Sequence, residues 1–291
     1  MVENKLTWQS KLVLLAVLPF AGTEVVLDGS WWASHAAPVA VWTVGLSVLL
    51  GLVTWKLRAA TPFAAVTGAL ITASLMFSTA VVPYQAWHTA LVPTLTVSLL
   101  AFAATRTGRR QKERRGSAEN RRGRSASQIA ANLGLAALVA SSPVQSWLMD
   151  SRWLPHHAAT PSLLFALTVA ALAEAAADTV SSEIGQVIGG RPRMITSFKA
   201  VDAGRNGAVS LAGSIAGVVA AAIVAWAGMW ALGGGWGFFW MSSAGGVFGL
   251  FFDSLLGATF EECGWLNNDA VNFLSTASAA GFALALLCAM H

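Results

Sequence analysis

The residues most able to do chemistry follow a long apolar segment in the second half of the chain. The stretch EAAADTVSSEIGQVIGGRPR, residues 174–193, places Glu174, Asp178 and Ser182 at four-residue spacing, and Glu183 follows directly. On a helix the first three side chains share one face, and Glu183 lies about 100° further round the axis. A carboxylate in or near a hydrocarbon core costs about 2.5 kcal/mol or more unless it faces a partner or a wet cavity. This group therefore predicts a bound cation.

Several cations fit that prediction. A Lys or Arg from another helix, a proton, Na⁺ and Mg²⁺ all remain open, and a buried ion pair that braces helices is the purely structural alternative. Oxygen ligands suit a hard ion, and Mg²⁺ commonly combines one or two carboxylates with waters and substrate phosphates. Zinc is disfavoured because the candidate ligands are scattered along the chain. These are His35, His88, His156, His157, His291, Cys263 and Cys288.

A glycine-rich basic segment comes next, GQVIGGRPRMITSFKAVDAGRNGAVSLAG, residues 185–213. Glycine lets a phosphate approach the backbone, Lys and Arg add positive charge, and a helix N-terminus offers free N–H donors. The segment predicts an anion site, although it has no Walker A pattern and an ordinary turn is the alternative. The residues assigned to it are Lys199, Gly204, Arg205, Asn206, Gly207 and Ser210.

Three other clusters carry polar groups near the ends of apolar segments. Asp253 stands inside FGLFFDSLLGATFEE, where a carboxylate between apolar residues needs a partner. The segment NNDAVNFLST supplies Asn and Asp at the start of a helix, where capping is the alternative to a binding role. The segment RSASQIAANLG places a basic and two amide side chains on one helix face, where helix packing is the alternative. The residues are Asn268, Asp269 and Asn272 in the second cluster, and Arg124, Gln128 and Asn132 in the third.

The composition of the chain predicts that membrane-spanning helices position these residues. Of the 291 residues 55% are hydrophobic and 11% charged, with a mean hydropathy of +0.61, and runs of about 20 apolar residues span a bilayer as helices. We expect an all-α polytopic bundle that forms a single membrane domain over residues 1–291, with an uncleaved first helix. The nine expected spans are 11–27, 36–55, 62–82, 88–104, 127–148, 161–188, 208–232, 236–258 and 271–290.

Basic residues orient this bundle. The segment 105–126 holds nine of the 18 Lys and Arg residues, and the positive-inside rule makes it a cytoplasmic loop. With nine spans, most other basic residues fall on the same side and only Arg152 does not. We therefore expect a bacterial inner-membrane protein whose N-terminus and site face the cytoplasm, with the catalytic elements in residues 127–275. The loop lacks a nucleic-acid-binding motif. The residues on the cytoplasmic side are Lys5, Lys11, Lys56, Arg58, Arg191, Arg193, Lys199 and Arg205.

Taken in order, GRSASQIAANLG, ADTVSSEIG, ITSFKAVDAGRNGAVSLAG, FDSLLGATFE and NNDAVNFLS resemble the motifs of the transmembrane protein 19 family. This family includes the chloroplast phytyl-phosphate kinases and is distantly similar to dolichol kinase and phosphatidate cytidylyltransferase. The sequence departs from the family pattern at Val180, Asp202 and Arg205, where Trp, Pro and Thr are usual.

The resemblance implies a membrane enzyme that transfers a phosphoryl group from CTP, or another nucleoside triphosphate, to an isoprenoid monophosphate. It implies one or two Mg²⁺ ions on Asp178, Glu183 and Asp253, with Lys199 as a further catalytic residue. The other motif residues would bind substrate or nucleotide, Ser182 among them. Two alternatives stay open. One is a cytidylyltransferase that makes a CDP-lipid, and the other is a secondary transporter with carboxylates at the membrane midplane.

Overall fold

The computed structural model describes residues 6–115, 123–151, 154 and 160–289. The expectations for Lys5, Arg152, His156, His157 and His291, and for part of the 105–126 loop, fall outside these ranges. The first half contains α1 (Thr7–His35), α2 (Ala37–Lys56), α3 (Pro62–Ser78), η1 (Ala86–His88), α4 (Leu91–Arg106) and α5 (Arg109–Arg115). The second half contains α6 (Ala126–Ala140), α7 (Ser142–Met149), α8 (Pro161–Ile188), β1 (Arg193–Met194), β2 (Ala208–Val209), α9 (Leu211–Ala231), α10 (Trp236–Leu256), the π-helical turn η2 (Gly257–Glu261) and α11 (Asn268–Ala289).

Hydroxyl side chains start several of these helices. Thr61, Thr160 and Ser210 each accept a hydrogen bond from a backbone N–H in the first turn of α3, α8 and α9, respectively. Ser125 begins α6 with a capping box, in which its hydroxyl and the Gln128 side chain satisfy each other's backbone N–H groups. These caps satisfy N–H groups that a helix leaves unpaired and that lipid cannot satisfy.

The expectation of an all-α membrane bundle is confirmed in outline. Among the described residues, six helices are long and apolar enough to cross a membrane, namely α1, α2, α8, α9, α10 with η2, and α11. The pair α6 and α7 makes a seventh only if its 53° bend is counted within one span. Nine full spans are not confirmed, because α3 and α4 have only 17 and 16 residues. The range 127–148 is broken at Ser141, after which Pro143 lies in the first turn of α7.

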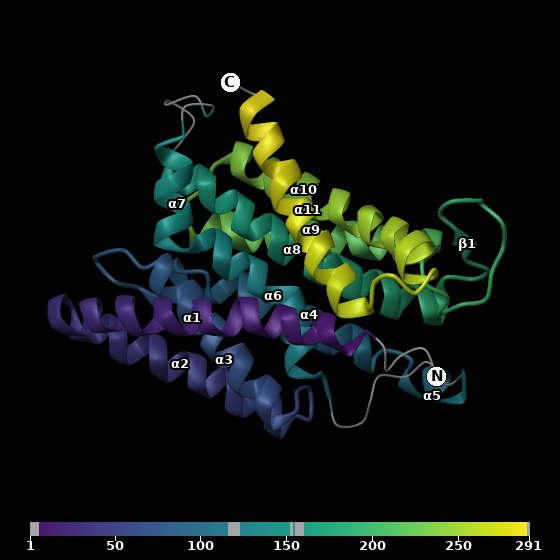
Figure 1. Ribbon diagram of the computed structural model, residues 1–291, viewed down its shortest axis with the longest axis horizontal. Coiled ribbons are helices and arrows are strands. Elements are labelled where there is room, and N and C mark those ends of the chain that lie inside the picture. The colour runs from purple at the N-terminus through teal and green to yellow at the C-terminus, as the bar shows by residue number, and fades with distance from the viewer. Residues whose placement is uncertain (1–5, 116–122, 152–153, 155–159, 290–291) are drawn as a thin grey trace.

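Helix α8 is the interior helix of the bundle. Its most apolar window is 83% buried, against 22% for α1 and for α2. It packs against α4, α6, α9, α10 and α11, and Figure 1 shows the purple and blue helices α1–α3 together on one side of the molecule, with the green and yellow helices α9–α11 on the other. Helices from both halves of the chain therefore pack around α8, which carries several of the candidate residues.

Glycines on α9 and α10 allow α8 to approach closely. A Cβ added at Gly217 would lie 2.9 Å from the Ala177 carbonyl oxygen, and one at Gly246 would lie 2.7 Å from the Ala173 Cβ. Small residues on α9 and α10 thus allow close packing of these helices against α8. Because the next glycine along α10, Gly249, faces Glu174 in the same way, this packing also brings the carboxylates of α8 and α10 together.

One end of the bundle collects the polar termini of the helices, and we call it the basic end. There α1, α3, α6, α9 and α11 begin, and α2, α4, α8 and α10 end. Hydrogen bonds join these termini, including Gln9 Nε2 to the Trp265 carbonyl (2.8 Å) and Arg106 Nη2 to the Leu57 carbonyl (2.9 Å). In Figure 1 the start of α1, α5 and β1 lie at this end. The described basic residues that were expected on one side of the membrane lie at this end. That this end faces the cytoplasm stays a prediction.

Candidate functional site

A polar pocket lies at the basic end between α6, α8 and α11. It is lined by residues from three separate sequence motifs, and eight of its nine lining residues were predicted as site residues. The predicted residues are Arg124, Gln128, Asn132, Asp178, Ser182, Glu183, Asn268 and Asn272, and the ninth is Thr179. Residues as far apart in the sequence as Arg124 and Asn272 therefore contribute to one pocket.

The α6 side of this pocket is held rigidly. Arg124 donates its backbone N–H to the Ala59 carbonyl (3.0 Å) and accepts from the Thr61 N–H (3.0 Å), which ties it to the α2–α3 link. The Gln128 side chain is partly used by the capping box, and Asn132 Nδ2 donates to the Gln128 carbonyl (2.8 Å). A preorganised wall of this kind suits ligand binding, because little side-chain freedom is lost when a ligand arrives.

Arg124 connects α6 with α8. Its Nη2 donates to the Thr179 hydroxyl at 3.3 Å, and its guanidinium group attracts the Asp178 carboxylate. Thr179 was not selected from the sequence, although its position directly after Asp178 places it near the same pocket. The pocket thus presents a guanidinium group beside a carboxylate, an arrangement that can hold a phosphate and a cation together.

Further carboxylates lie behind Asp178. Asp253 on α10 interacts electrostatically with Asp178, Glu174 and Glu261. Glu174 is 1% exposed, and a Cβ on Gly249 would come within 2.4 Å of its Cγ. Among the described residues, Glu174 Oε1 and Asp253 Oδ2 are buried acceptors without a hydrogen-bond partner. Such acceptors are costly unless a cation or a donor satisfies them.

Glu183 already has a cationic partner. It forms an ion pair with Lys112 of α5, whose side chain is buried and also donates to the Ala104 carbonyl at 3.1 Å. Lys112 was missed in the sequence because it stands among the basic residues of RRQKERR, where only topology and lipid attraction were inferred. No local signal in that segment separates Lys112 from its neighbours.

The predicted magnesium ligands fit the ion in part. Among the described residues, no group of three or more His, Cys, Asp or Glu side chains is arranged to hold a metal ion, and Glu183 is paired with Lys112. Asp178 and Asp253 interact with each other, and Asp253 has an unsatisfied oxygen. Mg²⁺ commonly takes only one or two carboxylates and completes its shell with waters and nucleotide phosphates. Asp178 and Asp253 suit such an ion, whereas a cage that includes Glu183 is not assembled.

The Asn and Asp cluster of α11 divides into two roles. Asn267 caps the helix, since its Oδ1 accepts from the Ala270 N–H at 2.9 Å. Asp269 is 8% exposed and accepts from the Ser10 hydroxyl at 2.6 Å, which fastens α1 to α11. Asn268 and Asn272 instead line the polar pocket. Capping therefore explains Asn267 but not these two asparagines, and Asp269 has a structural contact outside the pocket.

The glycine-rich segment does not line the polar pocket. Lys199 and Asn206 are exposed, and Arg205 forms an exposed ion pair with Glu262 at 2.7 Å. Gly204 and Gly207 have positive φ angles of 92° and 73°, as turns require. Ser210 caps α9. The residues predicted to bind phosphate thus lie in two places, the polar pocket and this glycine-rich segment. The nucleotide-binding role of the segment stays a prediction.

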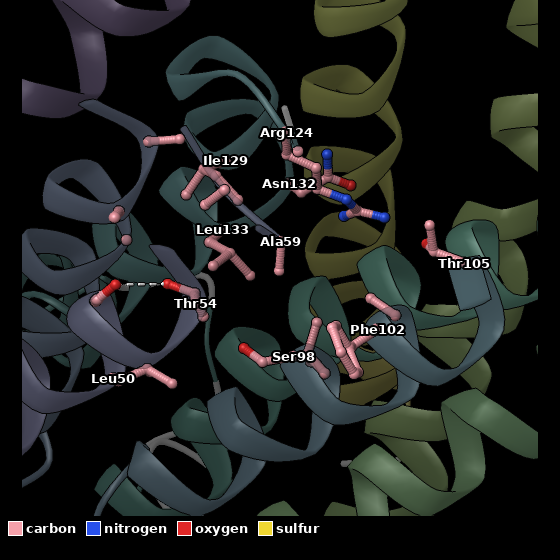
Figure 2. A pocket seen from close by; sticks show the side chains of 18 of the residues that line it. Leu50, Thr54, Ala59, Ser98, Phe102, Thr105, Arg124, Ile129, Asn132 and Leu133 are labelled. Carbon is pink, nitrogen blue, oxygen red and sulfur yellow. Dashed lines mark hydrogen bonds between the residues drawn. The ribbon is translucent and has the colours of Figure 1, made fainter. Parts of the chain in front are cut away.

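A second, largely apolar pocket adjoins the polar one. It lies between α2, α3, α4 and α6, and it shares Arg124 and Asn132 with the polar pocket. Figure 2 shows the Arg124 and Asn132 side chains next to each other at one edge, with Ile129 and Leu133 from α6 and Ser98 and Phe102 from α4 around the space beside them. A ligand with a charged end and an apolar body would contact both pockets at once.

Comparison with known proteins agrees with these motifs. Residues 45–280 match the sequence profile of the family described as integral membrane protein DUF92. An uncharacterized membrane protein of Methanocaldococcus jannaschii, MJ0933, is 36% identical over 122 residues, which cover 42% of this chain and 51% of that protein. Another of Synechocystis sp., sll0875, is 29% identical over 215 residues, which cover 69% of this chain and 74% of that protein.

A plant protein is also similar. The Arabidopsis thaliana protein VTE6, chloroplastic, is 29% identical over 198 residues, which cover 61% of this chain and 52% of VTE6. The chain thus spans about half the length of MJ0933 and of VTE6. No solved structure is significantly similar. These matches confirm the family resemblance of the motifs.

Proposed function

Because the chain belongs to the DUF92 family of integral membrane proteins, we propose that it is a membrane-embedded kinase of isoprenoid monophosphates. It transfers the γ-phosphoryl group of a nucleoside triphosphate, with CTP the favoured donor, to the lipid phosphate. The motifs resemble those of the phytyl-phosphate kinases, and a chloroplast protein is among the relatives. The observation that carries the proposal is that the polar pocket and the apolar pocket share Arg124 and Asn132.

The reaction needs positioning and charge neutralisation more than a nucleophilic side chain. An oxygen of the lipid phosphate attacks the γ-phosphorus, the new P–O bond forms, and the bond to the β–γ bridging oxygen breaks. The electron pair stays on that oxygen, which leaves with the nucleoside diphosphate. The acceptor is an ionised phosphate, so no proton has to be removed from it. This explains why the pocket needs no His or Cys nucleophile.

Each part of the pocket has a role in this scheme. Arg124 binds the acceptor phosphate, and its contact with Thr179 keeps the guanidinium group in place. Asn268 and Asn272 donate to phosphate oxygens from the opposite wall. Asp178 and Asp253 would hold Mg²⁺, which neutralises the charge of the transferred group when it is bound. Lys112 holds Glu183 at the edge of the pocket.

The two alternatives differ from the kinase in the place of the site or in the reaction products. A secondary transporter is expected to carry its binding residues near the membrane midplane, whereas the lining residues of the polar pocket lie at the basic end. A cytidylyltransferase would use the same kind of site but release pyrophosphate. The reaction products therefore separate the two enzyme classes.

The test uses purified full-length protein in lipid nanodiscs with Mg²⁺, phytyl or geranylgeranyl monophosphate, and each nucleoside triphosphate in turn. Mass spectrometry identifies the lipid and nucleotide products. We expect prenyl diphosphate and a nucleoside diphosphate, formed fastest with CTP. A CDP-lipid with pyrophosphate would instead identify a cytidylyltransferase, and the absence of turnover with every donor and acceptor would contradict the kinase proposal.

A further inference from the structure

We infer that the apolar pocket between α2, α3, α4 and α6 holds the isoprenoid tail of the acceptor, and that its depth selects the length of that tail. This inference rests on the proposed function and deepens it. It assigns specificity to helices of the first half of the chain, whereas the sequence directed attention to residues 127–275. The phosphate of the acceptor would then lie at Arg124, where the two pockets meet.

The lining of the pocket suits a hydrocarbon chain. Leu50, Val97, Ile129 and Leu133 supply apolar surface, and Gly68 is among the small residues that leave room. Four of the five hydroxyl side chains that also line it, all except Thr105, donate to carbonyls of their own helices. Thr54, Thr72, Thr94 and Ser98 donate to backbone carbonyls three or four residues earlier, at 2.7–2.9 Å. The threonines can therefore turn methyl groups towards the tail without leaving a polar hydrogen unsatisfied.

Positive charge is confined to one end of the pocket. Arg58 follows α2, Arg106 ends α4, Arg109 begins α5, and Arg124 precedes α6, and all four line the pocket at the basic end. Arg106 lies over the Phe102 ring, 4.6 Å from its centre. An apolar channel with arginines at one mouth complements an anion that carries one apolar tail.

The pocket extends deep into the bundle. Its lining on α4 runs from Thr94 to Arg106, which corresponds to about 18 Å along a helix. This is more than half of a hydrocarbon core of about 30 Å. A tail that enters at Arg124 would therefore reach well past the membrane surface, and its far end would contact the walls near Leu50, Thr72 and Thr94.

Another apolar groove serves as the comparison. It is lined by Phe248, Phe251, Phe252 and Phe282, together with Ile195, Ala244, Val247 and Leu255. Its lining contains no charged residue and has no residue in common with the polar pocket. A tail bound in this groove would therefore not connect with the phosphate-binding residues. The cross-linking experiment below would detect such binding.

The first experiment measures chain-length preference with C10, C15 and C20 prenyl monophosphates. Ser98→Phe and Leu50→Trp fill the pocket from opposite walls. The matched controls Leu99→Phe and Leu49→Trp alter neighbouring residues on the same helices that are 66% and 55% exposed. We expect kcat/KM for the C20 acceptor to fall roughly tenfold or more in both pocket variants, the effect of losing about two buried methylene groups. The C10 acceptor and both controls should change little. Equal effects on all chain lengths in folded pocket variants would overturn the inference.

The second experiment does not require turnover. A prenyl monophosphate with a diazirine at the end of its tail is cross-linked to the full-length protein in nanodiscs, and the labelled peptides are identified by mass spectrometry. We expect labels on α2, α3 and α4, displaced by phytyl monophosphate and reduced in Ser98→Phe but not in Leu99→Phe. Labels on α10 and α11, or equal displacement by phosphatidylglycerol, would overturn the inference.

The two experiments separate this inference from the proposed function. Labelling of α2–α4 by a protein that turns over no nucleotide supports the tail pocket and contradicts the kinase. Turnover combined with labels outside the pocket supports the kinase and contradicts the tail pocket.

Discussion

Lys112 and Glu183 form an ion pair that joins α5 to α8 beside the polar pocket. The lysine side chain is almost fully buried and also donates to the carbonyls of Ala104 and Thr105, at 3.1 and 3.4 Å. A short helix from the basic segment is thereby anchored to the end of α4 and to the interior helix. The segment that the sequence marks as a topology signal thus also holds Glu183, one of the residues that line the polar pocket.

Replacing Lys112 should destabilise the protein. Lys112→Met leaves the Glu183 carboxylate without its partner, and we expect a loss of about 3–5 kcal/mol in the free energy of unfolding. Thermal unfolding in detergent measures the change. The double variant Lys112→Met/Glu183→Gln should recover much of it because no uncompensated charge remains. The control Arg110→Met changes an exposed position on the same helix and should leave the stability unchanged. Equal losses of stability in Lys112→Met and Arg110→Met would contradict a specific ion pair.

Asp178 and Asp253 should be essential for activity but not for folding. Asp178→Asn and Asp253→Asn each remove a charge that would hold the metal, and we expect kcat to fall about 10²- to 10³-fold. Their thermal stability should stay the same or rise, because the asparagines relieve repulsion within the acidic group. Asp150→Asn, in the link after α7, is the matched control. Full activity of both aspartate variants would exclude their proposed role.

Gly249 should resist substitution. A Cβ there would meet Glu174 Cγ at 2.4 Å and the Ser275 carbonyl oxygen at 2.9 Å, so Gly249→Ala should cost about 1–3 kcal/mol of stability. At Gly281 on α11 a Cβ meets nothing within 4 Å, and Gly281→Ala should be neutral or slightly stabilising. Melting temperatures of the two variants, measured side by side, check the contrast, and similar values would argue against close α8–α10 packing.

Arg124 should not be replaceable by lysine. The guanidinium group donates to Thr179, and its planar fork of N–H donors matches the geometry of a phosphate in a way that a lysine ammonium group cannot reproduce. We expect Arg124→Lys to lower kcat/KM for the lipid phosphate about 10- to 100-fold. Steady-state kinetics with the acceptor varied test this, and Arg110→Lys is the control. An unchanged KM and kcat in Arg124→Lys would remove the arginine from the site.

Cys263 can report the orientation of the protein in the membrane. It is exposed in the link between η2 and α11, at the basic end, and the only other cysteine in the chain is Cys288. In a Cys288→Ala background, a membrane-impermeant maleimide should leave intact cells unlabelled and should label inverted membrane vesicles. Labelling of intact cells would place the basic end outside and contradict the expected topology.

Some features were predictable because they depend on local pattern. Four-residue spacing placed Arg124, Gln128 and Asn132 on one wall, and hydropathy located α8 over 161–188. The convergence of α6, α8 and α11 was expected only through the family resemblance, because helix propensity does not show which helices touch. In the structure Asn268 and Asn272 line the same pocket as Asp178.

Other features depend on long-range contacts and could not be predicted. The role of Lys112 follows from where α5 meets α8, which composition does not reveal. Within the glycine-rich segment 185–213, Gly189 makes room for the hydroxyl of Ser210, which would lie 2.4 Å from a Cβ at that position, and the phosphate-binding role of the segment stays a prediction. Glycine permits close approach by any group, so its presence alone does not identify what approaches.

The backbone bridge between Arg124 and the α2–α3 link also bears on how the protein can be divided. Gly123 touches the backbone at Ala59 so closely that a Cβ there would lie 2.5 Å from the Ala59 carbonyl carbon, and Arg124 exchanges backbone hydrogen bonds with Ala59 and Thr61. The arginine of the site is thus positioned by residues that precede it by about 60 positions. We therefore expect that neither half of the chain forms the candidate site by itself, and that grafting α6–α11 onto foreign N-terminal helices would require this junction to be transplanted with them.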